Sequence, residues 1–276
     1  MTSAPFFQIP RWFGRQGRRR QLDEFVDRSR TAAFGSRQMA VEQKVEAVMR
    51  HFDRVAPRYD FMNSLLSFGI QMVWKRAAVA LTGIKSGSRV LDVCGGTADL
   101  SLVAAGYAGA GGRLVVCDLN RAMMRHGRAK VVRAGLADRI GFVQGDAERL
   151  PFPDAAFDAA MVGFGIRNLT HLKQGFREMH RVLRPGGTFM CLEFSRPTNP
   201  LFRILYDLHS FAVMPFLGQV LAGNREGYRC LPETIRRFAL PEELKGILEQ
   251  IGFQAVAYRR FTNGIAVAHT GRKSPS

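Results

Sequence analysis

The chain has 276 residues, 46% of them hydrophobic, so it can bury the core of one large domain or of two small ones. This composition excludes disordered, collagen-like and coiled-coil proteins. The 40 Lys and Arg residues outnumber the 23 Asp and Glu residues, and the formal net charge of +17 attracts polyanions such as nucleic acid, anionic lipid or phosphorylated ligands.

The N-terminal part is basic and weakly patterned. Residues 1–48 are predicted to form a basic extension, partly disordered, in which no acidic residue precedes Asp23. A transit peptide is the alternative, although Pro5 and Pro10 interrupt an amphipathic helix. The run Arg18-Arg19-Arg20 is interpreted as a solvated tail, with contact to an anionic surface as the alternative.

From residue 89 onward strand-like and helical patterns alternate. Upstream, 41–62 is predicted to be a helix that breaks at Pro57. Strands are predicted at 89–94, 113–117, 140–144, 157–162, 188–194, 253–258 and 264–268. Helices are predicted at 99–108, 121–134, 172–183 and 241–251. The alternation favours a parallel sheet covered on both faces, which binds ligands outside the C-terminal ends of its strands.

Cysteines and apolar runs limit the alternatives. No CxxC pair suggests structural zinc, so we expect reduced thiols and no metal site. No run of about 18 apolar residues occurs, so no transmembrane helix is predicted. The nearest stretch, 211–222, is interrupted by Pro215. The four cysteines are Cys94, Cys117, Cys191 and Cys230.

Glycines and acids follow the first three predicted strands. Gly95 and Gly96 permit a tight turn and a close approach of a ligand to the backbone. Asp118 follows Gly95 by 118 − 95 = 23 residues, a spacing that suits a carboxylate accepting bonds from two ribose hydroxyls. Asp146 can reach an adenine amino group. The sequence therefore predicts a nucleotide-bearing cofactor.

Two cofactor classes compete for this turn. A dinucleotide needs G-x-G-x-x-G with its pyrophosphate at a helix N-terminus, and Leu100 stands where the last glycine would be. Asp99 places a negative charge in the first helical turn, which favours a cationic ligand over a pyrophosphate. S-adenosyl-L-methionine carries a sulfonium and an amino group and has no phosphate, so it is the cofactor that we expect.

Motifs spread from about residue 49 to 271 resemble those of the ubiquinone/menaquinone biosynthesis C-methyltransferase family (UbiE/MenG/Coq5-like). The matching positions are 55–60, 62–63, 74–75, 164–168, 192–195, 206–207, 210–211, Tyr228, Leu231, Glu233 and 234–236. The resemblance implies an α/β fold of the class I S-adenosylmethionine-dependent methyltransferases over 49–276. That fold is Rossmann-like, with a seven-stranded, mostly parallel sheet and a reversed last hairpin.

The same resemblance implies where the cofactor binds. It implies cofactor contacts at Thr97, Asp118, Asp146 and Ala147, beside the turn of Gly95 and Gly96 that lets the cofactor approach. Tyr59 is expected either to close over the cofactor or to be a half-buried core aromatic. At Gly163 a contact is either lost or made by the backbone. The chain departs from the family pattern twice. Ala98 stands where the family usually has glycine, and Gly163 stands where it often has a serine that holds the cofactor.

Four residues are candidates for the chemistry on a quinol ring. Methylation of a ring carbon needs a base, or a charge that stabilises the phenolate, in a pocket that excludes water. Arg167 is expected to stabilise the phenolate and orient a water, unless it forms a surface salt bridge. Asn168 is a substrate-orienting residue or a helix cap. His209 is a base or a polar filler, and Tyr206 faces the substrate or packs in the core.

Apolar segments at 61–81 and 195–237 are expected to cover the substrate. They suit the tail of a polyprenyl quinol, either demethylmenaquinol or a 2-methoxy-6-polyprenyl-1,4-benzoquinol, or they are ordinary lid packing. Basic residues near them would attract anionic lipid, so peripheral membrane contact is predicted.

The expected location is the cytoplasm, or an organellar matrix if the extension is a transit peptide. A homodimer is left open. Removal of residues 1–40 is expected to leave methyl transfer to a soluble quinol nearly intact.

Two rival functions remain. One is methylation of another apolar small molecule, such as a sterol or a phenol. The other is an RNA-binding methyltransferase-like protein, which the charge of +17 favours. The positive charge is spread along the chain and no aromatic-rich RNA motif stands out, so no nucleic-acid partner is expected.

Overall fold

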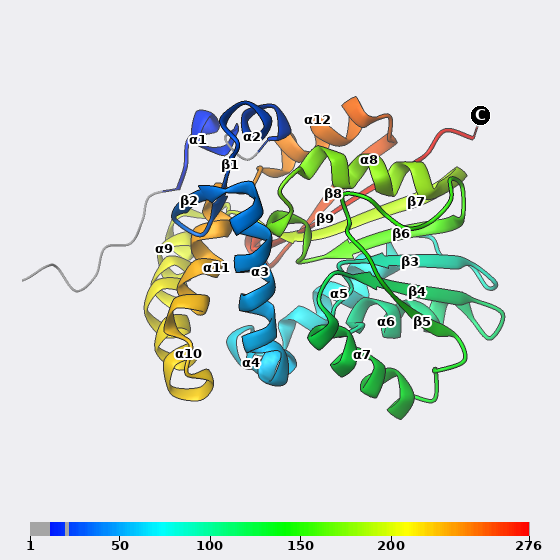
Figure 1. The fold of residues 1–276 in the computed structure, drawn as a ribbon, viewed down its shortest axis with the longest axis horizontal. Coiled ribbons are helices and arrows are strands. Elements are labelled where there is room, and N and C mark those ends of the chain that lie inside the picture. The colour runs from blue at the N-terminus through cyan, green and yellow to red at the C-terminus, as the bar shows by residue number, and fades with distance from the viewer. Residues whose placement is uncertain (1–11, 20–21, 276) are drawn as a thin grey trace, which may run out of the picture.

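Seven strands form one sheet in the order β5-β4-β3-β6-β7-β9-β8 (Figure 1). The computed structural model describes residues 12–19 and 22–275. The first five strands pair in parallel, and β9 runs antiparallel to both of its neighbours, β7 and β8. The predicted mostly parallel sheet with a reversed last hairpin is confirmed. The strands are β3 (Arg89–Val93), β4 (Arg113–Asp118), β5 (Ile140–Gln144), β6 (Phe157–Gly163), β7 (Leu183–Phe194), β8 (Gln254–Phe261) and β9 (Ala266–Arg272).

Helices cover both faces of this sheet (Figure 1). Helices α5 (Ile70–Ala80), α6 (Asp99–Ala108) and α7 (Arg121–Arg133) bury side chains against one face. Helices α8 (Leu172–Val182) and α12 (Pro241–Ile251) cover the other. Strands buried on both faces are apolar throughout, which is why the sequence marks them so clearly.

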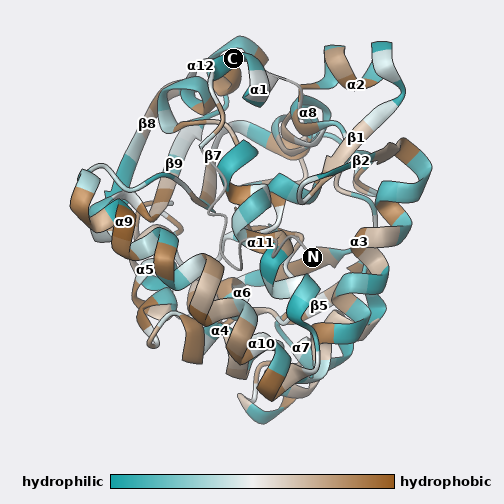
Figure 2. Ribbon diagram, turned by 90° about the vertical axis from the view of Figure 1, so that its left-hand side faces the viewer, coloured by the Kyte–Doolittle hydropathy of each residue, from teal (hydrophilic) through white to brown (hydrophobic). Residues whose placement is uncertain are grey.

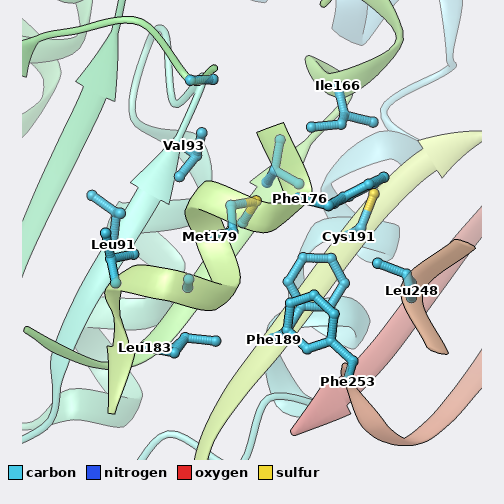
Figure 3. Packing of buried hydrophobic residues seen from close by; sticks show 14 of the residues in the cluster. Leu91, Val93, Ile166, Phe176, Met179, Leu183, Phe189, Cys191, Leu248 and Phe253 are labelled. Atoms are coloured by element: carbon cyan, nitrogen blue, oxygen red, sulfur yellow. The ribbon is translucent and has the colours of Figure 1, made fainter. Parts of the chain in front are cut away.

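The mainly aliphatic core under α8 and α12 contains a group of packed phenylalanine rings (Figure 3). Phe189 of β7 packs against Phe176 of α8 at 5.7 Å between ring centroids and against Phe253 at 4.5 Å. Met179 and Leu248 complete the contact, and neither is exposed. Full burial of each such side chain contributes about 1.5–3 kcal/mol, so this layer fixes α8 on the sheet.

The N-terminal region is folded more extensively than expected. It contains α1 (Arg15–Arg19), α2 (Asp23–Ser29), the hairpin β1 (Thr31–Phe34) and β2 (Arg37–Ala40), and α3 (Val41–Val55). Val26 and Ala32 are each 1% exposed, so packing stabilises elements too short to show a periodic pattern. The predicted boundary at residue 48 falls inside α3. Pro5, Pro10 and Arg20 lie outside the described residues.

A cap of helices lies beside the C-terminal ends of the strands. It consists of a 3-10 turn (Ala56–Arg58), α4 (Tyr59–Leu66), α9 (Pro200–Leu208), a π-helical turn (His209–Val213), α10 (Met214–Ala222) and α11 (Arg225–Arg237). The break predicted at Pro57 is present as the 3-10 turn.

The cap also differs from the sequence prediction at Pro215. A π-helical turn precedes this proline, and α9 runs on into α10 without interruption. The continuous helix Pro200–Ala222 is therefore long and apolar enough to cross a membrane by length and composition, although 22% of its apolar window is buried. The expectation of an interrupted stretch here was wrong.

Candidate active site

All eight predicted cofactor residues line one cavity of about 200 Å³. The cavity lies where β3, β4 and β6 end, and helix α3 closes its outer side. The eight residues are Tyr59, Gly95, Gly96, Thr97, Asp118, Asp146, Ala147 and Gly163.

Asp118 is held rigidly at the end of β4. Its Oδ2 accepts the backbone N–H of Gly96 at 2.9 Å, and its Oδ1 accepts that of Asn120 at 2.7 Å. Burial nevertheless raises the pKa of this carboxyl. Each oxygen keeps a lone pair, so the group can still accept two hydroxyl donors. A Cβ on Gly95 would lie 2.8 Å from Cγ of Asp92, so the turn needs glycine there.

Asp92 is a site residue that the sequence did not single out. It is 1% exposed, and its Oδ2 accepts bonds from the N–H of Ser101 at 3.1 Å and from its hydroxyl at 2.7 Å. Its Oδ1 has no hydrogen-bond partner, and the residue lines the cofactor cavity. Burial raises its pKa to about 7. A buried carboxylate with one free oxygen fits the ammonium group of S-adenosylmethionine.

Asp99 does not supply the counter-charge that the sequence assigned to it. Lys75 Nζ lies 2.7 Å from its Oδ2, and Lys130 pairs with its Oδ1. Lys130 also contacts Asp60 at 2.7 Å, and the hydroxyl of Thr97 donates to Asp60 at 2.7 Å. Two lysines therefore neutralise Asp99, and the argument from this residue to a cationic cofactor was wrong.

The two departures from the family pattern have local explanations. Ala98 takes the left-handed conformation, at φ +66°, that a glycine adopts more easily. A Cβ on Gly163 would lie 2.7 Å from Cδ1 of Leu100. The leucine fills the space that a serine side chain would need.

A second cavity of about 490 Å³ adjoins the first, and its wall is mainly apolar. The four predicted catalytic residues, Arg167, Asn168, Tyr206 and His209, all line it. Four residues line both cavities and therefore mark where the two meet: Phe52, Tyr59, Phe164 and Asn168.

Arg167 forms a buried ion pair, so it is not a surface salt bridge. Its Nη1 lies 2.8 Å from Oε1 of Glu193, and its guanidinium carbon lies 5.5 Å from the ring centre of Phe194. Glu193 is 2% exposed, and burial raises its pKa although Arg167 opposes the shift. Nε of Arg167 is buried without a partner. The arginine is thus oriented by Glu193 and retains a free donor.

Tyr206 and His209 differ in protonation near neutral pH. Burial raises the pKa of Tyr206 to about 12, so its hydroxyl is a donor at neutral pH. Burial lowers the pKa of His209, so its imidazole is neutral. The ring of His209 lies 5.9 Å from that of Phe68, which is 85% exposed, so His209 stands near the mouth of the cavity.

His51 of α3 is a second histidine in the substrate cavity, and no sequence motif marks it. Its ring packs 6.0 Å from Phe34 and 5.2 Å from Phe52. Burial lowers its pKa to about 4, and the charges of Arg167 and Arg54 add to the shift. The imidazole is therefore neutral and lies within the field of Arg167.

Among residues 12–19 and 22–275, no group of three or more His, Cys, Asp or Glu side chains could hold a metal ion. The site therefore consists of paired and unpaired carboxylates around the first cavity and of one arginine with neutral donors and acceptors around the second.

Comparisons with known proteins agree with this arrangement. The cyclase SpnF superposes with a TM-score of 0.62 at 17% identity, covering 83% of this chain and 96% of that chain. A SAM-dependent methyltransferase from Aquifex aeolicus superposes with a TM-score of 0.53 at 18% identity, covering 72% and 88% of the two chains. These likenesses confirm the class I methyltransferase fold.

Sequence relatives are more specific. A ubiquinone/menaquinone biosynthesis C-methyltransferase UbiE from Hahella chejuensis (strain KCTC 2396) is 43% identical over 244 residues, which are 88% of this chain and 98% of the relative. A family model, that of the ubiE/COQ5 methyltransferase family, matches residues 37–273, which include all the residues predicted here to be catalytic or to bind the cofactor. The chain therefore belongs to the ubiE/COQ5 methyltransferase family.

Proposed function

We propose that this chain transfers the methyl group of S-adenosyl-L-methionine to a ring carbon of a polyprenyl quinol, as a C-methyltransferase of menaquinone or ubiquinone biosynthesis. The substrates that fit are demethylmenaquinol and 2-methoxy-6-polyprenyl-1,4-benzoquinol. The observation that carries the proposal is the junction of a carboxylate-lined cavity with an apolar one at Phe52, Tyr59, Phe164 and Asn168.

The first cavity holds the cofactor. When bound, S-adenosylmethionine supplies an electrophilic methyl group on its sulfonium sulfur. Asp118 accepts the ribose hydroxyls, and Asp146 with Ala147 holds the adenine. Asp92, whose Oδ1 has no hydrogen-bond partner, lines the same cavity and would hold the ammonium group. Gly163 leaves the cofactor without a side-chain hydroxyl at the end of β6.

Arg167 acts on the quinol oxygen in the second cavity. As the phenolic proton leaves, negative charge grows on that oxygen, and the guanidinium held by Glu193 stabilises it. The charge raises electron density at the neighbouring ring carbon, which is the nucleophile. Once that carbon carries the methyl group, its hydrogen leaves as a proton and the phenolic oxygen regains a proton, so that the ring is an aromatic quinol again. Asn168 and the protonated Tyr206 orient the ring by hydrogen bonds.

A neutral imidazole accepts the phenolic proton. His51 and His209 are both neutral near pH 7, since burial lowers both pKa values. Both rings line the substrate cavity with Arg167, and the charge of Arg167 adds to the lowering of the pKa of His51. Either imidazole can accept the proton, and His209 lies nearer the mouth of the cavity, beside the exposed ring of Phe68.

The substrate cavity opens on an exposed apolar surface, where a lipid-soluble tail would leave it. Phe68 and Leu205 line the cavity and are 85% and 57% exposed. Figure 2 shows hydrophobic stretches of ribbon on α9 and α10, interspersed with hydrophilic ones. We name this surface the apolar face; its exposed side chains are Phe61, Phe68, Val73, Leu201, Ile204, Leu205, Leu208, Phe216 and Val220.

The apolar face is the part that contacts the membrane in this proposal. Its side chains enter the outer layer of the bilayer while the net charge of +17 attracts anionic lipid. The protein then works as a peripheral enzyme, in the cytoplasm or in an organellar matrix. A homodimer through the same face is the competing arrangement.

Complementation tests the reaction. Expression in strains blocked in the menaquinone or the ubiquinone C-methylation is expected to restore at least one quinone, detected by mass spectrometry as the product with one methyl group more than the accumulated precursor. Failure in every strain, together with methylation of a sterol or simple phenol by the purified protein, would assign it to another acceptor.

A further inference from the structure

The chain carries an ordered segment upstream of the part that the family model matches. The model begins at residue 37. We call the described residues 12–19 and 22–34 the arm. The arm contacts the cap, helix α12, the start of α8 just after the catalytic segment (Arg167 and Asn168), and the substrate cavity. Four contacts carry the inference.

The first contact joins the arm to the cap. The ring of Trp12 lies 5.0 Å from the guanidinium carbon of Arg236, which is 1% exposed. Arg236 on α11 pairs with Asp207 on α9 at 2.6 Å. Tyr206, beside Asp207, lines the substrate cavity. Trp12 therefore covers the ion pair that ties the two cap helices together behind the cavity wall.

The second contact fixes the arm to α12. Nε and Nη2 of Arg18 each lie 2.8 Å from a carboxylate oxygen of Glu243. The side chain of Arg18 is 11% exposed. A two-pronged bond of this kind sets orientation as well as distance, so α1 cannot rotate freely over α12.

The third contact holds the helix that follows the catalytic segment. Helix α8 has His171 at its N-cap, and this residue makes no side-chain cap bond. Asp23 of α2 caps the helix instead, because its two oxygens accept the N–H groups of Lys173 and Gln174 at 2.9 Å each. Asp23 is 7% exposed. Helix α8 begins four residues after Asn168, so the cap also constrains the Arg167 segment.

The fourth contact is with the substrate space. Phe34, the last residue of β1, lines the cavity of about 490 Å³. Its ring lies 6.0 Å from that of His51. The arm thus supplies a piece of the cavity wall.

We propose that the arm is a strap that positions the catalytic segment and the cap, and that substrate methylation depends on it. Its residues act through Arg167, Tyr206 and the cavity wall, so they are positioning residues. The inference rests on the proposed function only in taking the apolar cavity as the acceptor site. It replaces the expectation that residues 1–40 can be removed with little loss of methyl transfer.

The test uses the full chain and point variants. Asp23→Ala removes the remote cap of α8, and Asp23→Asn retains one acceptor oxygen. Trp12→Ala uncovers Arg236, and Trp12→Phe retains a ring. Arg28→Gln is the matched control, since Arg28 is an exposed residue of α2 with no hydrogen bond or ion pair among the described residues.

Initial rates with a short-tailed quinol, calorimetric affinity for S-adenosylmethionine and amide exchange are measured on each variant. Asp23→Ala is expected to lower kcat about tenfold and to speed exchange in the first turn of α8. Trp12→Ala is expected to raise the KM for quinol about tenfold and to speed exchange in α11. Cofactor affinity stays within about twofold, and Asp23→Asn and Trp12→Phe recover most of the loss.

Wild-type rates and exchange in both alanine variants would overturn the strap. If Asp23→Ala fails to fold, Trp12→Ala decides alone through its KM and its exchange in α11. If the wild-type chain methylates no quinol, the proposed function fails while the exchange data still confirm or overturn the strap.

Discussion

Arg167 lines the substrate cavity and is paired with Glu193, so its proposed role depends on the geometry of the guanidinium group as well as on its charge. Lysine at this position keeps the charge and loses the planar fork that bonds Glu193 and leaves Nε free. Arg167→Lys is therefore expected to reduce turnover about 10²-fold or more, the range for loss of one oxyanion-stabilising donor. Single-turnover rates at saturating cofactor measure the effect.

Cofactor affinity provides the control for this variant, because Arg167 does not line the cofactor cavity. Near-normal binding of S-adenosylmethionine is expected by calorimetry. An unchanged rate would move the phenolate partner to another residue, and a large loss of cofactor affinity would place Arg167 on the wrong ligand.

Asp92 makes cofactor binding dependent on pH. Its pKa is raised to about 7 by burial, so the carboxyl is largely protonated at pH 5.5 and ionised at pH 7.5. Only the ionised form attracts the ammonium of S-adenosylmethionine. Below pH 7, the affinity for S-adenosylmethionine is expected to rise by at most about tenfold per pH unit. Above pH 7 it is expected to level off.

Asp92→Asn is the control for that titration. The variant is expected to bind the cofactor weakly at both pH values, with no rise between them. A similar rise in Asp92→Asn would assign the titration to another group, such as Asp118, whose pKa burial also raises.

Gly163 and Leu100 form a coupled pair. Gly163→Ser brings a Cβ to 2.7 Å from Cδ1 of Leu100, so the buried side chain of the leucine must shift. Overpacking of this kind costs about 1–3 kcal/mol in the free energy of unfolding. The double variant with Leu100→Ala is expected to cost less than the sum of the two single changes, by urea denaturation. Additive costs would show that the two side chains do not compete for space.

His171 links Asp27 of α2 to Glu148, which lines the first cavity, and this contact depends on pH. Burial lowers the pKa of His171, but its bond to Glu148 and the charge of Asp27 outweigh that effect, and the pKa is raised overall. Nδ1 lies 2.8 Å from Glu148 and Nε2 lies 3.1 Å from Asp27. A raised pKa means that the protonated form stabilises the fold.

The stability from His171 is fully present below the unfolded pKa of about 6.5 and is lost as the pH rises through the higher folded pKa. The Tm of the wild-type chain minus that of His171→Gln is expected to fall between pH 6 and pH 8. A constant difference across this range would mean that the pKa of the histidine is the same in the folded and the unfolded chain, which contradicts a raised folded pKa.

The elements with a strong repeating pattern could be predicted from the sequence, and the isolated short ones could not. Helices α6 and α12 and strand β5 have the predicted bounds, because buried strands and amphipathic helices carry a regular apolar pattern. The arm carries no such apolar pattern, since each of its elements spans seven residues or fewer and depends on contacts with distant parts of the chain. The start of β7 was placed five residues late, because Pro185 and the glycines after it resemble a turn.

In the candidate site, too, some residues could be predicted from the sequence and others could not. Carboxylates that follow a strand, such as Asp118 and Asp146, could be located because the C-terminal ends of parallel strands share one edge. Asp92 lies inside a strand, and His51 lies on a helix far upstream in the chain. Their roles depend on burial and on an unpartnered oxygen, which no local pattern reveals.

At the scale of the whole molecule, the proposed contact with the membrane depends on the exposed side chains of the apolar face. Phe68 and Ile204 are 85% and 63% exposed on this face. Burying each such side chain in lipid is worth about 1.5–3 kcal/mol. The double variant Phe68→Ser with Ile204→Ser is therefore expected to bind anionic vesicles at least about tenfold more weakly, by flotation.

Val132→Ser is the matched control, because Val132 on α7 is 63% exposed and lies outside the apolar face. This variant is expected to bind vesicles like the wild-type chain. Binding is also expected to fall as salt screens the attraction between the basic chain and anionic lipid. A different result would contradict the membrane assignment: the wild-type chain sediments as a dimer, the double serine variant sediments as a monomer, and neither binds vesicles. A second copy of the chain would then cover the apolar face.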